Sequence, residues 1–271
     1  MPDRDALLRL AIDAAEGAGA LLQGAVHDAR TSVEHKSSAT DMVTEMDQAA
    51  EAFIVSTVRA ARPDDGVLGE EGSNEAGTSG VRWIIDPLDG TTNYVYGFPA
   101  YAVSVAVEVD GEVAVAAVHD PSHSETFTAI RGRGAWCNGR RLHVGGPPAV
   151  ATALVATGFS YLPERRAWQA DVVARLMSAV RDIRRAGAAS LDLCWVAAGR
   201  VDIFFERGLQ PWDYSAGALI ASEAGAVVGD LEGGPPSSDI VVATPPSIDT
   251  AFRDLLTDAE AAADPTPRTA G

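Results

Sequence analysis

Residues 83–93 read WIIDPLDGTTN and pass abruptly from apolar to acidic and then to small polar residues. The three apolar residues at the start are typical of a short strand in a buried sheet. Asp86 and Asp89 follow, and Pro87 lies between them. Pro87 fixes its own φ and disfavours a helical conformation at Asp86, so the chain cannot coil directly after the strand. The stretch therefore predicts a buried strand that presents two carboxylates at the sheet edge where α/β proteins bind ligands.

Four acids stand at the ends of expected elements: Glu70 in LGEEG, Asp86, Asp89, and Asp213 in PWDYSAG. Each also has a purely structural explanation. Glu70 could be solvated in a loop, Asp89 could form an Asx turn, and Asp213 could cap the following helix. Two carboxylates about 4 Å apart repel by roughly 4 kcal/mol at an effective dielectric constant near 20, so a fold gathers several only with protonation or bound cations. A set of oxygen ligands favours hard ions such as Mg²⁺.

The residues after Asp89, GTTN at positions 90–93, supply free backbone N–H groups and hydroxyls. If they open a helical turn, these groups form an anion site suited to phosphate. A metal site beside a phosphate cradle indicates metal-assisted phosphoryl transfer to water. The sequence has no GxxxxGKS or GxxxxGKT loop, which argues against a nucleotide-dependent kinase.

The composition limits the class of protein. At 271 residues, with 46% hydrophobic and 22% charged residues, the chain is typical of a soluble globular protein. It contains no apolar run of the roughly 18–20 residues that a membrane span needs, no secretory signal pattern and only two cysteines, so a cytoplasmic protein is expected. The formal net charge of −17 argues against nucleic acid as a partner. It fits a cation-binding protein or a surface with excess acid equally well.

Periodicity and turn signals predict the order of the elements. The expected helices are 5–26, 42–62, 164–179, 189–198, 214–224 and 248–256, the second preceded by a capping-box pattern at 38–41. The expected strands are 83–85, 101–109, 112–118, 124–130, 134–144, 153–156, 201–205 and 240–243. Asp110-Gly111 predicts a hairpin between the second and third of these strands.

A change of composition at GGPP, residues 145–148, predicts a boundary between two lobes. Residues 1–146 are expected to form an α+β lobe with most of the candidate ligands. Residues 147–258 are expected to form an α/β lobe that completes the site. Residues 259–271 have little apolar surface to bury and are expected to be a disordered tail.

Four segments together resemble the inositol monophosphatase family: LGEEG at 68–72, WIIDPLDGTTNYVYGFP at 83–99, RRAGAASLDLCWVAAGRVDIFFERG at 184–208 and PWDYSAG at 211–217. The similarity runs in order from about residue 5 to 257. The resemblance implies a five-layer αβαβα sandwich of mixed α/β class and Mg²⁺-dependent hydrolysis of a phosphate monoester. It also implies inhibition by lithium and a homodimer.

The resemblance further implies which residues hold the metal. A first Mg²⁺ would be held by Glu70, Asp86 and the Leu88 carbonyl. A second would be held by Asp86, Asp89 and Asp213, and a weaker third would lie near Glu70. Two or three ions per site are therefore expected.

Catalytic roles follow from the same resemblance. Glu70 and Thr91 would position and activate a metal-bound water, with Asp47 hydrogen-bonded to Thr91. The amides of Gly90 and Thr91 would hold the phosphate. A water oriented near Asp89 would protonate the leaving group.

Lys36 is the only lysine among 21 basic residues, which chance alone could produce. It lies in HKSSATDMVTEMD at 35–47, which resembles a family segment whose lysine approaches the metal and phosphate site. A functional role for Lys36 is therefore expected, because arginine cannot easily replace a compact charge in a crowded site.

By the same resemblance, substrate contacts are expected from Asp89, Gly187, Ala189, Glu206 and Asp213. Glu206 would accept hydrogen bonds from inositol hydroxyls, although it could instead be a surface acid at a strand end. The GTTN ending resembles the inositol branch and makes inositol 1-phosphate the expected substrate. Histidinol phosphate, fructose 1,6-bisphosphate and 3′-phosphonucleotides are alternatives. A regulatory protein that acts by contact with partners is a further alternative, disfavoured by the complete set of ligand positions.

Two positions depart from the family pattern. GAAS at 187–190 stands where GSAA or GTAA is usual, and Ser215 stands where alanine is common. Both changes exchange one small residue for another. They are expected to affect substrate detail more than the chemistry.

Overall fold

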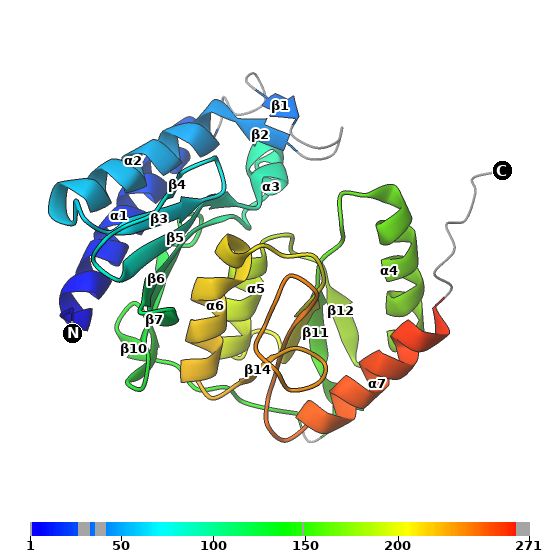
Figure 1. The fold of residues 1–271 in the computed structure, drawn as a ribbon. Coiled ribbons are helices and arrows are strands. Elements are labelled where there is room, and N and C mark those ends of the chain that lie inside the picture. Colours follow the sequence, from blue (N-terminus) through cyan, green and yellow to red (C-terminus); the bar gives the residue numbers. More distant parts are fainter. Residues whose placement is uncertain (1, 27–32, 36–41, 148, 264–271) are drawn as a thin grey trace.

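The computed structural model describes residues 2–26, 33–35, 42–147 and 149–263, and these form five layers (Figure 1). Helices and sheets alternate through the layers. In order they are α1 (Arg4–Ala25) with α2 (Glu45–Ala61), an eight-stranded sheet, α5 (Ala189–Ala197) with α6 (Pro211–Glu223), a five-stranded sheet, and α4 (Pro163–Leu176) with α7 (Asp249–Ala262). The arrangement confirms the expected five-layer sandwich of mixed α/β class.

Antiparallel neighbours dominate the eight-stranded sheet, whose order is β10-β9-β8-β7-β6-β5-β3-β4 and in which β3 and β5 are the parallel pair. The predicted hairpin joins β6 to β7. Its turn residues Asp110 and Gly111 have φ values of 52° and 86°, as a type I′ turn requires. The strands are β3 (Gly66–Gly69), β4 (Asn74–Glu75), β5 (Val81–Asp89), β6 (Ala102–Val109), β7 (Glu112–Asp120), β8 (Glu125–Ile130), β9 (Gly134–Cys137) and β10 (Arg140–Arg141).

The five-stranded sheet is mixed and has the order β12-β11-β13-β15-β14. β11 runs parallel to β12 and to β13, whereas β15 runs antiparallel to β13 and to β14. The strands are β11 (Leu154–Thr157), β12 (Asp182–Arg184), β13 (Ile203–Glu206), β14 (Val227–Gly229) and β15 (Val241–Thr244). A short 3₁₀ helix, η2 (Val150–Thr152), leads into β11.

Apolar side chains cover both faces of each sheet. Leu22 of α1 and Ile54 of α2 pack in one core with the outer face of the first sheet. Helix α5 contributes to two cores, since Leu191 packs towards the first sheet and Leu193 towards the second. A helix buried between two sheets is apolar around its circumference. Both expected lobes share this middle layer, so the division of the chain into lobes stays a prediction.

Several expected boundaries are wrong. The strand expected at 83–85 spans 81–89, and the strand expected at 134–144 is two short strands, β9 and β10. Helix α2 begins at Glu45, because β2 (Met42–Thr44) pairs antiparallel with β1 (Val33–His35) and takes up the residues before it. The capping-box pattern at 38–41 lies outside the described residues. The expected tail from residue 259 starts too early, because α7 continues to Ala262 and Ala259 is buried in the outer core of the second sheet. In the described part of the chain, no helix has both the length and the apolar character to cross a membrane.

Candidate active site

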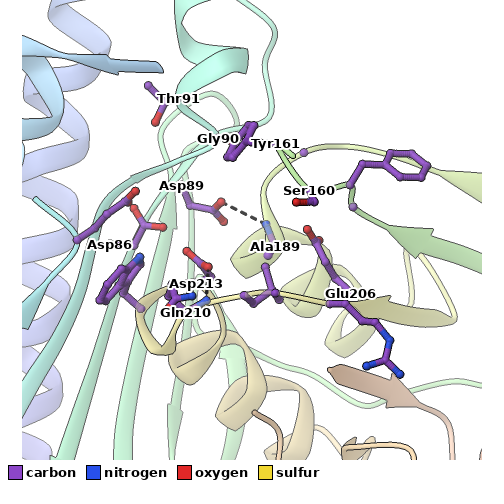
Figure 2. Close-up of a pocket in the computed structure, with 18 of the residues that line it drawn as sticks. Asp86, Asp89, Gly90, Thr91, Ser160, Tyr161, Ala189, Glu206, Gln210 and Asp213 are labelled. Atoms are coloured by element: carbon purple, nitrogen blue, oxygen red, sulfur yellow. Dashed lines mark hydrogen bonds between the residues drawn. The ribbon is translucent and has the colours of Figure 1, made fainter. Parts of the chain in front are cut away.

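A cavity of about 330 Å³ opens where the end of β5 meets the first turns of α5 and α6. Figure 2 shows four acids directed towards it: Asp86 and Asp89 from β5, Asp213 from α6 and Glu206 from β13. The cavity is lined by every residue expected to contact metal, phosphate or substrate: Glu70, Asp86, Leu88, Asp89, Gly90, Thr91, Gly187, Ala189, Glu206 and Asp213. Asp47 contacts Thr91, and Lys36 lies outside the described residues.

Asp86 and Asp89 reach the same cavity because β5 is irregular at its end. Side chains of a regular strand alternate between faces, so residues three apart would point to opposite sides. Asp86 pairs with Ser104 of β6. Asp89 pairs with Ala102, so three steps along β5 correspond to two steps along β6. Pro87, which has no N–H for the sheet, lies in this bulge, and the bulge turns both carboxylates towards the cavity.

The chain turns at Gly90 directly after the second carboxylate. Gly90 has a φ of 89°, in the left-handed region that favours glycine. A Cβ at this position would lie 2.9 Å from the Ala100 carbonyl oxygen, so a larger residue is also excluded by contact. Helix α3 (Thr91–Tyr96) starts immediately afterwards, so the helical turn considered for residues 90–93 is present.

The Thr91 hydroxyl is held between two acceptors. Its Oγ1 lies 3.0 Å from Asp47 Oδ1 and 3.1 Å from the Leu88 carbonyl oxygen. One hydroxyl proton serves one acceptor at a time, so donation to Asp47 leaves the Leu88 carbonyl available to another group. Asp47 is fully buried in α2, so the bond to Thr91 is shielded from water.

The first turn of α5 fixes the Asp89 carboxylate. Oδ1 accepts a hydrogen bond from the Ala189 N–H at 3.2 Å, and Oδ2 accepts bonds from the Ser190 N–H at 2.7 Å and the Ser190 hydroxyl at 2.5 Å. A carboxylate at a helix N-terminus is favoured by these N–H groups and by the helix dipole. The departure from the family pattern at 187–190 thus places a hydroxyl on a candidate metal ligand.

Asp213 lies in the first turn of α6. Its Oδ2 accepts a hydrogen bond from the Gln210 N–H at 2.6 Å, as part of a capping box at the start of the helix. The structural explanation considered for Asp213, a helix cap, is therefore correct. The same residue also lines the cavity beside Asp86 and Asp89, so the cap and a ligand role are compatible.

Burial and mutual repulsion raise the pKa values of the acids in the cavity. Burial raises the pKa of Asp86 well above its usual range, and the charges of Glu70, Asp89 and Asp213 raise it further. Burial raises the pKa of Asp89 to about 6, although the hydrogen bonds from Ser190 oppose the change. Burial, with the charges of Asp89 and Glu70, raises the pKa of Asp213 well above its usual range. These carboxyl groups therefore favour either protonation or a bound cation.

Glu206 forms the opposite wall of the cavity, at the end of β13 (Figure 2). Burial raises the pKa of its carboxyl to about 8, an effect that the nearby Arg185 guanidinium opposes. Protonated Glu206 donates a hydrogen bond, and ionised Glu206 accepts one. The side chain therefore faces the cavity in a state that can bind hydroxyl groups, and it is not an isolated surface acid.

The donor set fits a hard divalent cation. The ligands are carboxylate and carbonyl oxygens, and neutralising them requires either protons or a cation. In the described ranges, no group of three or more Asp, Glu, His or Cys side chains is arranged to hold a metal ion as it stands. The cavity thus gathers oxygen ligands without a closed coordination shell. The residues that would hold Mg²⁺ are Glu70, Asp86, Leu88 through its carbonyl, Asp89 and Asp213.

Sequence reasoning missed several residues that line or support the cavity. Ser160 and Tyr161 lie between β11 and α4, where no motif marked them. Arg185 and Gln210 lie in or beside the quoted motifs but were given no role. Asp192 was missed because it lies on an apolar helix and does not line the cavity. The first four of these residues reach the cavity through tertiary contacts, and a local pattern does not carry that information.

The fold and the acidic cavity place the chain among the five-layer αβαβα proteins. Residues 3–261 match the model of the inositol monophosphatase family. Nus factor SuhB of Escherichia coli strain K12 is 43% identical over 230 residues, which cover 84% of this chain and 86% of that protein. Nus factor SuhB of Pseudomonas aeruginosa is 44% identical over 237 residues, with the same coverage of each.

Solved structures agree with the sequence relatives. Extragenic suppressor protein suhB from Bartonella henselae is similar with a TM-score of 0.87 and 38% identity, covering 93% of this chain and 98% of that one. The inositol monophosphatase from Anabaena (Nostoc) sp. PCC 7120 has a TM-score of 0.81 and 34% identity, covering 96% and 97%. The chain belongs to the inositol monophosphatase family.

Proposed function

We propose that this protein is a Mg²⁺-dependent phosphatase that hydrolyses a phosphate monoester, with inositol 1-phosphate as its substrate. The observation that carries the proposal is the convergence of four acids on one cavity beside the turn at Gly90: Glu70, Asp86, Asp89 and Asp213. Family membership supports the reaction class and the choice of Mg²⁺. Two or three ions per site and inhibition by lithium are part of the proposal.

The chain's own groups would orient the reactants. Bound Mg²⁺ would supply a Lewis acid for the phosphate oxygens and would lower the pKa of water. Glu70 and Thr91 orient the attacking water, and Asp47 orients Thr91 through its 3.0 Å hydrogen bond. The amides of Gly90 and Thr91 bind phosphate oxygens. Asp89, fixed by α5, orients the water that protonates the leaving oxygen.

The substrate assignment rests on Glu206, Gly187 and Ala189. Glu206 lines the cavity from the end of β13, whereas Gly187 and Ala189 line it next to Gly90 and Asp89. The alcohol part of the substrate would lie among these three residues. A carboxyl group with a pKa of about 8 donates or accepts a hydrogen bond near neutral pH, which suits the several hydroxyls of inositol. Lys36, outside the described residues, keeps its proposed role near the phosphate as a prediction.

A phosphate-release panel tests the proposal. The wild-type protein is assayed with inositol 1-phosphate, histidinol phosphate, fructose 1,6-bisphosphate and a 3′-phosphonucleotide, each with Mg²⁺, with and without Li⁺. We expect Mg²⁺-dependent release that is fastest with inositol 1-phosphate and is inhibited by Li⁺. A higher rate with histidinol phosphate would overturn the substrate assignment. No release from any substrate would overturn the phosphatase proposal.

A second candidate function is a regulatory role through contact with macromolecules. Relatives that are 42–44% identical are named Nus factor SuhB, which is the name of a factor and not of an enzyme. The name suggests contact with the transcription machinery, so nucleic acid is no longer excluded as a partner. The net charge of −17 favours contact with protein over contact with nucleic acid. A variant without phosphatase activity that keeps the cellular role would support this candidate. A homodimer and a cytoplasmic location stay predictions.

A further inference from the structure

Helix α2 presents two buried carboxylates one turn apart. Asp47 is fully buried and Glu51 is 4% exposed. Residues four apart lie on the same face of a helix, so both side chains point from α2 towards the end of the first sheet. Asp47 holds Thr91. Glu51 has no role in the site described so far.

Glu51 binds the loop that carries Glu70. Its Oε2 accepts a hydrogen bond from the Glu71 N–H at 2.7 Å, and its Oε1 accepts one from the Ser73 N–H at 3.0 Å. Hydrogen bonds to an ionised acceptor are about twice as strong as neutral ones. One buried carboxylate therefore holds two backbone amides that closely follow Glu70 in the chain.

The backbone before Glu70 is shaped to admit the same carboxylate. A Cβ at Gly69 would collide with Glu51 Oε2, so only glycine allows this approach. The Gly69 N–H donates to the Ser73 carbonyl at 2.6 Å and closes the loop, and the Glu70 N–H donates to the Ile85 carbonyl of β5 at 3.2 Å. Glu70 is thus flanked on both sides by backbone that packs against or bonds to Glu51.

We propose that Glu51 is a positioning residue, which fixes the Glu70 carboxylate by holding the amides of Glu71 and Ser73. Because Asp47 also accepts the hydrogen bond from the Thr91 hydroxyl, α2 is then the element that sets the separation of Glu70 from Thr91. Its kinetic consequence rests on the proposed function, because these two residues orient the attacking water there. Its structural consequence, an ordered loop that presents a metal ligand, is independent of catalysis.

Glu51→Gln tests the proposal, with Glu45→Gln as the matched control. Glu45 is an exposed glutamate in the same helix. The glutamine side chain introduced in place of Glu51 can accept one of the two hydrogen bonds, while its NH₂ group faces the second amide. In the metal-free protein, we expect hydrogen exchange at the Glu71 and Ser73 amides, followed by NMR, to accelerate about 10- to 100-fold in Glu51→Gln only. We expect the Kd for Mg²⁺, measured by calorimetry, to rise about 10- to 100-fold.

The values of kcat and KM distinguish a role in positioning Glu70 from a general loss of folded structure. We expect Glu51→Gln to lower kcat while the KM for inositol 1-phosphate changes little, because orientation of water acts in the transition state. If exchange at both amides and the Kd for Mg²⁺ equal those of Glu45→Gln, the proposal is wrong. If the wild type releases no phosphate, the proposed function fails, whereas exchange and Mg²⁺ titration still decide the role of Glu51.

Gly69→Ala tests the contact between Glu51 and the loop by changing the loop residue. It replaces Glu51→Gln as the test if that variant does not fold. The substitution keeps the carboxylate but places a methyl group against Oε2. Gly24→Ala is its control, since a Cβ at Gly24 meets no atom within 4 Å. We expect Gly69→Ala to accelerate exchange at Glu71 and Ser73 and to weaken Mg²⁺ binding. Wild-type exchange and wild-type affinity in this variant would contradict the proposal.

Discussion

Asp192 shows how one buried side chain makes the stability of this fold depend on pH. Both of its carboxyl oxygens are buried and have no hydrogen-bond partner among the described residues. Burial raises its pKa well above the usual 3.8, and the charges of Glu206 and Asp89 raise it further. The folded protein therefore holds a proton that the unfolded chain releases. The stability from this group is fully present below pH 3.8 and is lost as the pH rises through the raised folded pKa.

We predict that Asp192→Asn becomes more stable than wild type as the pH rises. The amide cannot ionise, so the variant avoids the growing cost of a buried unpaired charge. Thermal unfolding at several pH values between about 5 and 9 should show a Tm difference that moves in favour of the variant. The exposed Asp13, changed to Asn, is the control. A Tm difference that stays constant with pH would contradict the assignment.

The sequence predicted which residues would line the cavity where those residues are close together in the chain. Asp86, Asp89 and Gly90 lie in one stretch, in which an apolar run, a proline and a glycine can be recognised from the sequence alone. Prediction from the sequence did not succeed where a contact spans the chain. The Ser190 N–H that holds Asp89 comes from 101 residues away, and Glu51 reaches Ser73 across 22 residues. No spacing rule relates such residues before the helices and sheets are packed.

At the scale of elements, the end of β5 and the start of α3 form one unit. The bulge between Asp86 and Asp89 directs both carboxylates towards the cavity. Gly90 then turns the chain into the short helix α3. The sequence predicted a strand that ends at residue 85, whereas β5 continues through the bulge to Asp89. The bulge was not predicted, because it is defined by the pairing with β6. The short strands β3, β4, β12 and β14 were missed for a related reason. Each has two to four residues, too few to show periodicity.

We predict that Gly90→Ala destabilises the protein and disturbs the site together. The left-handed φ and the contact with the Ala100 carbonyl both oppose a Cβ, with a cost of about 1–3 kcal/mol. Thermal unfolding should show a fall in Tm of about 2–4 °C per kcal/mol. Gly24→Ala, in the open α1 position, should be neutral or slightly stabilising. Equal Tm values for the two variants would contradict this account of the turn.

The whole molecule brings its acids together by stacking layers. The eight-stranded sheet supplies Asp86 and Asp89, and the middle helix layer supplies Asp213 and the first turn of α5. The fold class could be predicted from the resemblance of four motifs, and the antiparallel character of the first sheet from its hairpin signals. The resemblance implied a helix layer between two sheets, but that α5 and α6 form this layer was not predicted, because an apolar helix gives no indication of which sheets cover it.

We predict that Mg²⁺ stabilises the whole fold by binding only the folded state. At a concentration 100-fold above its Kd, a bound ligand adds about 2.7 kcal/mol to the free energy of unfolding. For a domain of this size, Tm should rise by about 5 °C or more. KCl at matched ionic strength is the control for screening of the net negative charge. An equal rise with KCl would mean that the cavity does not bind Mg²⁺ specifically.

The most direct measurement of the central claim is Mg²⁺-dependent phosphate release from inositol 1-phosphate by Asp86→Asn and by wild type. Without metal, burial and neighbouring charges already hold the pKa of Asp86 well above its usual range, so a neutral amide should leave the fold intact. As the proposed ligand of both ions, Asp86 should be indispensable, and we predict a fall in release of about 100-fold or more. Release at the wild-type rate by the folded variant would contradict the account.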